Sequence, residues 1–125
     1  MVILTADELV EYRAALADDA DALHAFDMVE DCDGDLEDAA ISLALRTGQE
    51  PDRSDQWLES VAKRWRTVLC GTTIRAALET RQVAVAVRSL TTEAGISVEL
   101  AVPIVLFALK TGISDFCKPL EEKLS

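Results

Sequence analysis

The residues that most resemble a site for chemistry form the acidic segment, residues 31–38, which reads DCDGDLED. Carboxylates at alternate positions are typical of an EF-hand loop, which binds Ca²⁺ and requires Gly at its sixth position and Glu at its twelfth. When Asp31 is counted as the first position, the sixth is Leu36 and the twelfth is Ser42. The acidic segment therefore departs from the calcium motif at both decisive positions.

The same segment has the features of a boundary between two helices. Gly34 is suited to end one helix, and Asp35 is suited to cap the next one. Asp38 then falls in the first turn, where the helix dipole favours negative charge. We predict a structural boundary here, with Asp31, Asp33 and Asp35 available as contacts for a partner.

A second set of carboxylates has a spacing suited to Mg²⁺. It consists of two pairs, each with its members three residues apart: Glu8 with Glu11, and Asp27 with Glu30. Such pairs on facing helices can place four carboxylates around one ion. The pattern resembles that of the all-α nucleotide pyrophosphohydrolases, E-x-x-E followed by E-x-x-D, although the second pair is reversed here. This resemblance implies an alternative function, a metal-dependent nucleotide hydrolase that uses these four residues and Mg²⁺.

Other signatures of catalysis are missing from the sequence. It has neither a G-x-S-x-G nucleophile motif nor a Gly-rich phosphate loop, and it has a single His. The three cysteines, Cys32, Cys70 and Cys117, lie far apart without a C-x-x-C pair, which argues against a zinc site. We predict free core cysteines and, since no signal peptide precedes the first helix, a cytoplasmic location.

Charge is distributed unevenly along the chain. Residues 1–50 hold 14 acidic and 2 basic side chains, a net of −12, whereas residues 51–125 hold 9 acidic and 10 basic side chains, a net of +1. Such an acidic surface repels phosphate backbones, so we expect no nucleic-acid binding. It favours a basic protein partner, while the short cluster Lys63, Arg64 and Arg66 can contact an anion.

Composition and periodicity predict an all-α fold. Half of the residues are hydrophobic, only 5% are aromatic, and 5 Gly and 3 Pro are too few for many hairpins. We predict one domain over residues 1–125, a bundle of six or seven helices. The predicted helices run from 5 to about 18, 19–30, 36–47, 55–70, 73–90, 97–110 and 114–123. The apolar run at 100–109 is too short to span a bilayer, so we expect no membrane association.

Two predicted helices carry alternatives. The segment 83–87, VAVAV, alternates as a strand does, but a single strand has nothing to pair with, which favours a helix. The helix 97–110 is apolar on every side and should be central, with Pro103 either kinking it or marking its first turn.

The predicted helix 55–70 carries two tryptophans on one stripe. Trp57 and Trp65 lie eight residues apart, which suits either two core anchors or an interface. If the other helices leave this stripe uncovered, a homodimer is the natural way to cover it.

Parts of the two halves resemble each other. YRAAL at 12–16 recurs as IRAAL at 74–78, and LALRTG at 43–48 recurs as FALKTG at 107–112. We consider an internal duplication with units 5–72 and 73–125, which would pack around a pseudo-twofold axis. Ala-Leu-rich helices that end in Gly also resemble one another by chance, so both interpretations stay open.

The sequence as a whole favours a small acidic protein-interaction or adaptor module without catalytic activity. Its predicted contact surface is the acidic first half or the 55–70 helix with its basic cluster. The alternatives are the metal-dependent nucleotide hydrolase and a purely structural homodimer.

Overall fold

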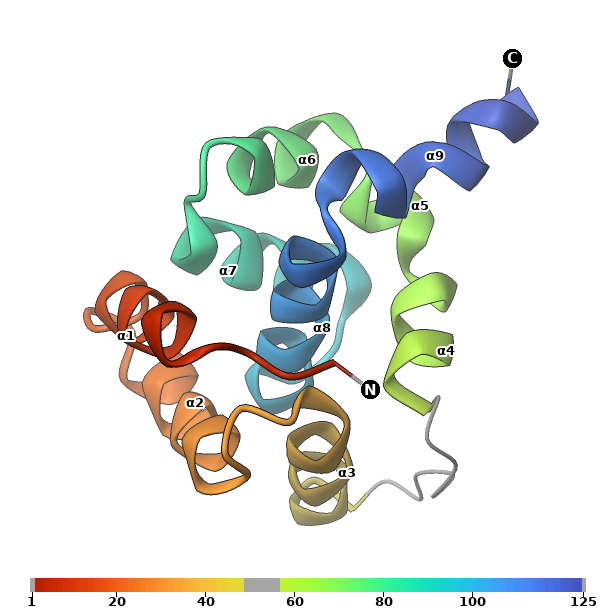
Figure 1. Cartoon of the computed structure of the whole chain (residues 1–125). Coiled ribbons are helices and arrows are strands. Elements are labelled where there is room, and N and C mark those ends of the chain that lie inside the picture. The colour runs from red at the N-terminus through yellow and green to blue at the C-terminus, as the bar shows by residue number, and fades with distance from the viewer. Residues whose placement is uncertain (1, 49–56, 125) are drawn as a thin grey trace.

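The apolar segment that follows Ser97 forms the centre of the fold. In the computed structural model, which describes residues 2–48 and 57–124, the other helices surround this segment (Figure 1). The described helices are α1 (Ala6–Ala15), α2 (Ala20–Asp31), α3 (Leu36–Arg46), α4 (Trp57–Arg64), α5 (Arg66–Leu69), α6 (Thr72–Glu79), α7 (Val83–Ala94), α8 (Val98–Thr111) and α9 (Ile113–Leu124). They pack into one compact domain, and the described residues contain no strand. The all-α prediction is confirmed.

Helix α8 is the central helix, as the sequence predicted. Every residue from Leu100 to Ala108 is buried, and α8 packs against α2, α3, α4, α7 and α9. The helix begins after Ser97, whose hydroxyl accepts the Leu100 N–H, and continues through Pro103. The alternative that Pro103 marks the first turn is therefore wrong.

Local side-chain caps define the starts of α1 and α2. Thr5 Oγ1 accepts the Glu8 N–H at 3.1 Å, and the Glu8 carboxylate accepts the Thr5 N–H at 2.9 Å. The chain then turns, and Asp19 caps α2 by accepting the Ala22 N–H. The predicted break between these two helices is confirmed.

The acidic segment is a helix boundary, as predicted. Gly34 has a φ of +84°, and Asp35 caps α3 by accepting the Asp38 N–H. The N-terminal segment fixes this boundary from outside, because Leu4 donates to the Gly34 carbonyl at 2.9 Å. The turn in the acidic segment is therefore held by backbone hydrogen bonds, both local ones and those with the N-terminal segment.

The prediction of six or seven helices is wrong, since the described residues form nine. Two predicted helices are each divided in the structure. The 55–70 helix breaks at Trp65, which separates α4 from α5, and its first two residues lie outside the described part of the chain. The 73–90 helix breaks at Arg81, whose φ of +57° separates α6 from α7. Neither break carries Gly or Pro, so the local sequence gave no signal for it.

The prediction that all three cysteines are free is wrong. Cys70 and Cys117 form a disulfide with their Cα atoms 5.8 Å apart, although they lie 47 positions apart in sequence. Cys32 remains free. Because disulfides persist in oxidising environments, the cytoplasmic prediction loses the support that free thiols gave it.

No single helix among the described residues is long and apolar enough to cross a membrane. Helix α8 together with Ile113–Leu120 of α9 reaches the required length and composition, but the chain bends by 95° between them. The apolar character of α8 is accounted for by its burial at the centre of the fold.

Candidate functional site

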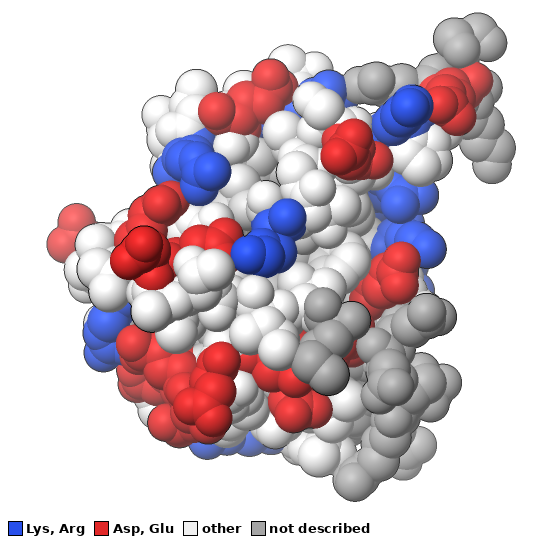
Figure 2. Space-filling view, in the orientation of Figure 1, with Lys and Arg blue, Asp and Glu red and all other residues white. Residues whose placement is uncertain are grey.

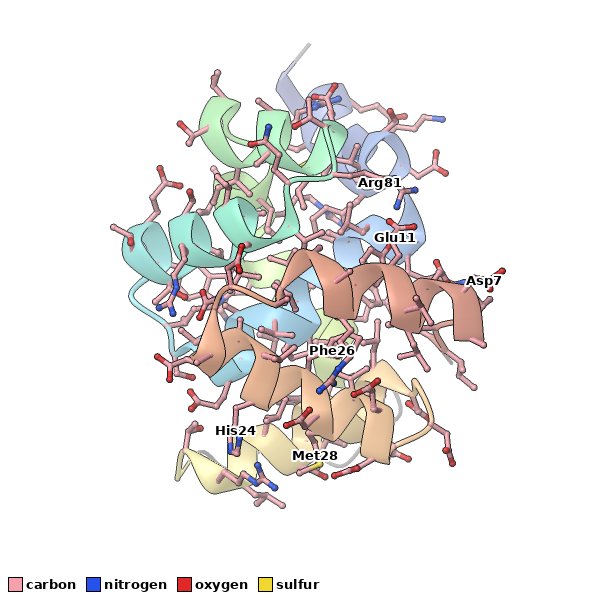
Figure 3. All side chains as sticks on the ribbon, turned by 90° about the vertical axis from the view of Figure 1, so that its left-hand side faces the viewer. Asp7, Glu11, His24, Phe26, Met28 and Arg81 are labelled. Atoms are coloured by element: carbon pink, nitrogen blue, oxygen red, sulfur yellow. A yellow bond between two sulfur atoms is a disulfide. The ribbon has the colours of Figure 1, made fainter. Side chains whose placement is uncertain are left out.

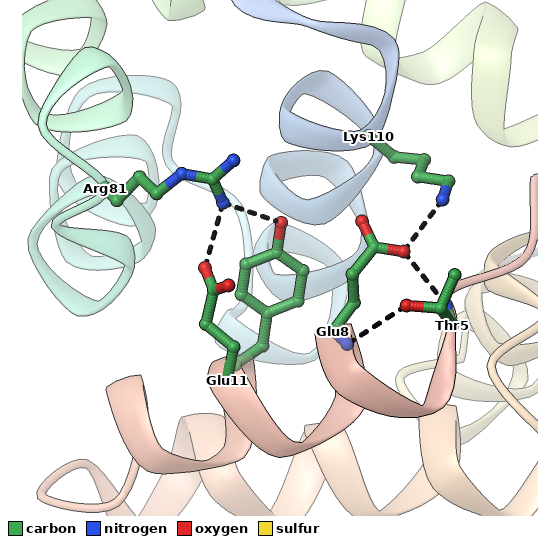
Figure 4. Close-up of polar contacts among 6 residues, drawn as sticks. Thr5, Glu8, Glu11, Arg81 and Lys110 are labelled. Atoms are coloured by element: carbon green, nitrogen blue, oxygen red, sulfur yellow. Dashed lines mark hydrogen bonds and ion pairs between the residues drawn. The ribbon is translucent and has the colours of Figure 1, made fainter.

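Glu8, in the first turn of α1, is paired with a cation from the second half of the chain (Figure 4). Lys110 Nζ lies 2.7 Å from Glu8 Oε1, while Glu8 also takes part in the cap at Thr5. Burial acts to raise the pKa of Glu8, but the hydrogen bonds from Lys110 and Thr5 outweigh it and hold the pKa below its ordinary value. Glu8 therefore fastens α1 to α8.

The next carboxylate of α1 meets a cation from the α6–α7 turn. Arg81 Nη1 lies 2.8 Å from Glu11 Oε2 and donates to the Tyr12 hydroxyl at 3.4 Å (Figure 4). Tyr12 is only 1% exposed, and this burial raises the pKa of its hydroxyl. Arg81 adopts a left-handed conformation that favours glycine, so its contacts offset a local backbone strain.

The start of α2 follows the same pattern. The Arg88 guanidinium forms two hydrogen bonds with the carboxylate of Asp19, which is also the cap of the helix. Arg88 holds the pKa of Asp19 below its ordinary value, with the Ala22 N–H adding to the effect. Acidic residues of the first half thus act as partners for basic residues of the second half.

The four carboxylates expected to hold Mg²⁺ are not brought together. Arg13 Nη1 lies 3.0 Å from Asp27 Oδ1 and also contacts Glu30, so a guanidinium holds the second pair. Glu8 and Glu11 are engaged by two other cations, as described above. Within the described parts of the chain, no group of three or more His, Cys, Asp or Glu residues is placed to hold a metal ion. The geometry gives the metal-dependent alternative no support.

The acidic segment differs from these paired carboxylates. Asp31, Asp33 and Asp38 are exposed and form no ion pair with a described residue. Figure 2 shows the largest group of acidic side chains over this part of the molecule, around α2 and α3 at the lower left. Burial, and then the charges of the surrounding aspartates, raise the pKa of the Cys32 thiol. A raised pKa disfavours the thiolate, the reactive form of the side chain.

One member of the acidic segment has a role that the sequence did not reveal. Glu37 is only 7% exposed, and its carboxylate accepts the Leu58 N–H at 2.9 Å and the Glu59 N–H at 3.3 Å. These donors belong to the first turn of α4, which Glu37 therefore caps from another helix. Burial raises the pKa of Glu37. Local spacing gave no signal for this contact, because its partners lie beyond the loop.

The tryptophans and the basic cluster lie on α4, α5 and the break between them. Trp57 and Trp65 are half-buried and pack against the core. Lys63 Nζ lies 3.1 Å from Glu59 Oε1, one turn away on α4. The Arg66 guanidinium lies 5.0 Å from the centre of the Phe116 ring, whereas Arg64 is exposed. Lys63 and Arg66 thus contact residues of their own chain, and the three basic side chains do not converge on one point.

A groove between α1 and α2 is the feature that sequence reasoning missed. It has a volume of about 350 Å³ and its lining is mainly apolar. The apolar lining residues are Leu9, Val10, Ala14, Ala17 and Leu23. The periodicity of α1 could have indicated it, since Val10, Ala14 and Ala17 repeat at helical spacing on the side away from Tyr12.

Comparison with protein-family models, with curated proteins and with solved structures finds no match to this chain. The resemblance to nucleotide pyrophosphohydrolases therefore rests on residue spacing alone.

Proposed function

We propose that this protein is a small interaction module, without catalytic activity, that binds a basic partner protein through its acidic segment. The observation that carries the proposal is the exposure of Asp31 and Asp33 without a cationic partner among the described residues. Like charges that lie close together repel one another, so their proximity does not help the fold. A cationic surface relieves that repulsion when it binds.

The shape of the acidic segment supports the same proposal. The hydrogen bond from Leu4 to Gly34 and the one from Leu36 to the Val2 carbonyl hold the turn from both sides. A pre-formed turn loses little conformational freedom when a partner binds, which favours affinity. Electrostatic complementarity then guides the approach of a basic partner and speeds association.

The remaining predictions have weaker support. The hydrolase would need carboxylates that are free to bind Mg²⁺, and Glu8, Glu11, Asp27 and Glu30 are each paired with Lys or Arg. A homodimer through the two tryptophans stays untested, and so does a cytoplasmic location. The proposal requires neither of them.

An internal duplication stays a proposal about the origin of the fold. The order of helices supports it, since α1, α2 and α3 match α6, α7 and α8 in sequence position, and α2 and α7 have 12 residues each. Gly48 and Gly112 both have positive φ after the third helix of their series. If the units are 5–72 and 73–125, then the acidic segment belongs to the first unit alone.

Binding of a fluorescent lysine-rich peptide, followed by fluorescence anisotropy at low and high salt, tests the proposed function. We expect Asp31→Asn with Asp33→Asn to weaken binding several-fold and to reduce its dependence on salt. Asn suits position 33 because Asp33 has a φ of +55°, which Asn tolerates.

The matched control changes the same amount of charge elsewhere. Glu93→Gln with Asp115→Asn removes two exposed carboxylates of the second half that also lack an ion pair with a described residue. This control should leave binding nearly unchanged. Equal losses in the two double variants would mean that only net charge matters, and the proposed docking role of the acidic segment would be wrong.

A further inference from the structure

The α1–α2 groove ends beside the acidic segment and is open to solvent. Figure 3 faces α1 and α2, which lie side by side. Val10 is 72% exposed, and Ala14 and Ala17 are exposed as well. Glu30 lines one end of the groove and is followed directly by Asp31. An apolar surface thus continues into a cluster of carboxylates.

Helix α1 has apolar residues on two opposite sides. Tyr12 and Leu16 point into the core and are buried. Val10 and Ala14, four residues apart, lie on the outer side, where small side chains permit another helix to approach closely. A surface helix of a self-sufficient domain needs only the inner stripe. The outer stripe is therefore suited to a partner helix.

Carboxylates lie in or near the groove in sequence: Glu30 lines it, Asp7 precedes Val10 by three residues, and Asp18 directly follows Ala17. Asp7, in the first turn of α1, and Asp18, in the turn after it, are exposed and form no ion pair with a described residue. On the α2 side lie Asp27 and Glu30, with Arg13 as the cation that pairs with both. A second copy of the chain seated here would bring acid against acid, so charge disfavours self-association on this face.

We propose that the α1–α2 groove binds an amphipathic helix of a partner protein, which buries an apolar stripe on Val10 and Ala14. Lysine or arginine residues beside that stripe pair with Asp7, Asp18 and the acidic segment. This is the helix-in-groove mode of recognition, with affinity from apolar contact and orientation from charge. The inference rests on the proposed function and names the chemistry of the partner.

The test uses a helix-forming peptide of about 18 leucine and lysine residues with its leucines on one face, and a scrambled peptide of the same composition. Both carry a fluorophore, and anisotropy reports their binding to the full chain. Val10→Glu adds a negative charge, which by itself attracts lysine, so a loss of binding in this variant reports the apolar contact. Val85→Glu is the matched control, because Val85 is 49% exposed on α7 and does not line the groove.

We expect the amphipathic peptide to bind more tightly than the scrambled one, and Val10→Glu to weaken it at least about tenfold, as truncation of a central contact does. Val85→Glu should leave the affinity unchanged. If both peptides bind equally and Val10→Glu has no effect, the proposal for the groove is wrong, while the proposed binding by the acidic segment stands. Failure of both peptides to bind at low salt overturns the proposed function as well. If Val10→Glu instead abolishes self-association of the wild type in sedimentation, the occupant is a second copy and the inference is wrong.

Discussion

Two groups of carboxylates in the first half of this chain have different surroundings. Glu8, Glu11 and Asp19 each meet a cation from the second half, namely Lys110, Arg81 and Arg88. The acidic segment is also rich in carboxylates, yet Asp31 and Asp33 meet no cation among the described residues. The two groups cannot be told apart by composition, since the difference lies in what the fold brings beside them.

The paired group connects helices that are far apart in sequence. Each pair is partly exposed and individually contributes little, since exposed ion pairs stabilise by about 0.2 to 1 kcal/mol. Their shared effect is orientation. Lys110 and Arg81 fix α1 against α8 and the α6–α7 turn (Figure 4), and Arg88 fixes the start of α2 against α7. The comparison shows that the paired carboxylates connect distant helices, whereas Asp31 and Asp33 are exposed and contact no cation among the described residues.

The largest expected effect comes from the glycine that shapes the acidic segment. In Gly34→Ala the new Cβ would lie 2.8 Å from the Leu4 carbonyl oxygen, at a φ of +84°. We expect a loss of about 3 kcal/mol in the free energy of unfolding, from backbone strain and the forced shift of the N-terminal segment. Urea denaturation measures it.

Gly48→Ala is the control for this prediction. Gly48 also has a positive φ, of +79°, but a Cβ there would meet nothing within 4 Å. The strain alone should cost about 1 kcal/mol. Equal losses in the two variants would show that the contact with Leu4 does not hold the acidic segment in place.

The second-largest effect on the free energy of unfolding is expected at Glu37, and it distinguishes Glu37 from the other carboxylates of the acidic segment. Glu37→Ala leaves two N–H groups at the start of α4 without their acceptor, and we expect a loss of about 2 kcal/mol. Glu37→Gln keeps one acceptor oxygen and should lose less. If urea denaturation gave Glu37→Ala the stability of the wild type, the cap between α3 and α4 would be unimportant.

The pH dependence of Glu37 follows from its raised pKa. The folded state holds this proton more tightly than the unfolded state, so the stability linked to it is full below the unfolded pKa and falls as pH rises through the folded pKa. Since Gln carries no such proton, the stability of Glu37→Gln relative to the wild type should increase as the pH rises from 4, near the ordinary Glu pKa of about 4.3, to 7. A constant difference over this range would contradict the buried charge.

A smaller effect tests the paired group. Asp19→Asn keeps a capping oxygen but removes the charge that pairs with Arg88, and we expect a loss of about 1 kcal/mol or less at pH 7. Because Arg88 lowers the pKa of Asp19, this stability is present above the unfolded pKa, about 3.9, and is lost as pH falls through the folded pKa. Combining Asp19→Asn with Arg88→Met in a double-mutant cycle isolates the pair. A coupling energy of zero at pH 7 would mean that Arg88 does not stabilise Asp19, which would then belong with the unpaired carboxylates.

The smallest effect is expected in the acidic segment itself. Asp31→Asn with Asp33→Asn should change the free energy of unfolding by less than about 0.5 kcal/mol, because neither carboxylate has a partner to lose. A slight gain at low salt would reflect relieved repulsion. A clear loss would mean that these charges are structural after all, and the comparison would no longer separate the two groups.

Features that depend on neighbouring residues could be predicted from the sequence. The cap at Asp35 was predicted, since its contact with the Asp38 N–H spans only three residues. The central position of α8 followed from its uniform apolarity. The breaks at Trp65 and Arg81 were missed because neither carries Gly or Pro; Trp65 packs against the core, and Arg81 contacts Glu11 and Tyr12.

The candidate site was only partly predictable for the same reason. Asp31 and Asp33 were selected from local charge density; both are exposed, and their role in binding stays a prediction. The hydrolase alternative rested on spacing, which does not reveal that Arg13 pairs with Asp27. The disulfide between Cys70 and Cys117 and the α1–α2 groove depend on residues from different helices, which no local pattern joins.

The most direct test of the account is to map the binding surface residue by residue. Backbone amide NMR shifts of the ¹⁵N-labelled protein, recorded during titration with the amphipathic lysine-containing peptide, report which residues meet it. The account predicts that the shift changes gather on α1, α2 and the acidic segment, with little change on α4, α5 or α9. Changes centred on Trp57 and Trp65, or spread evenly over the molecule, would contradict it.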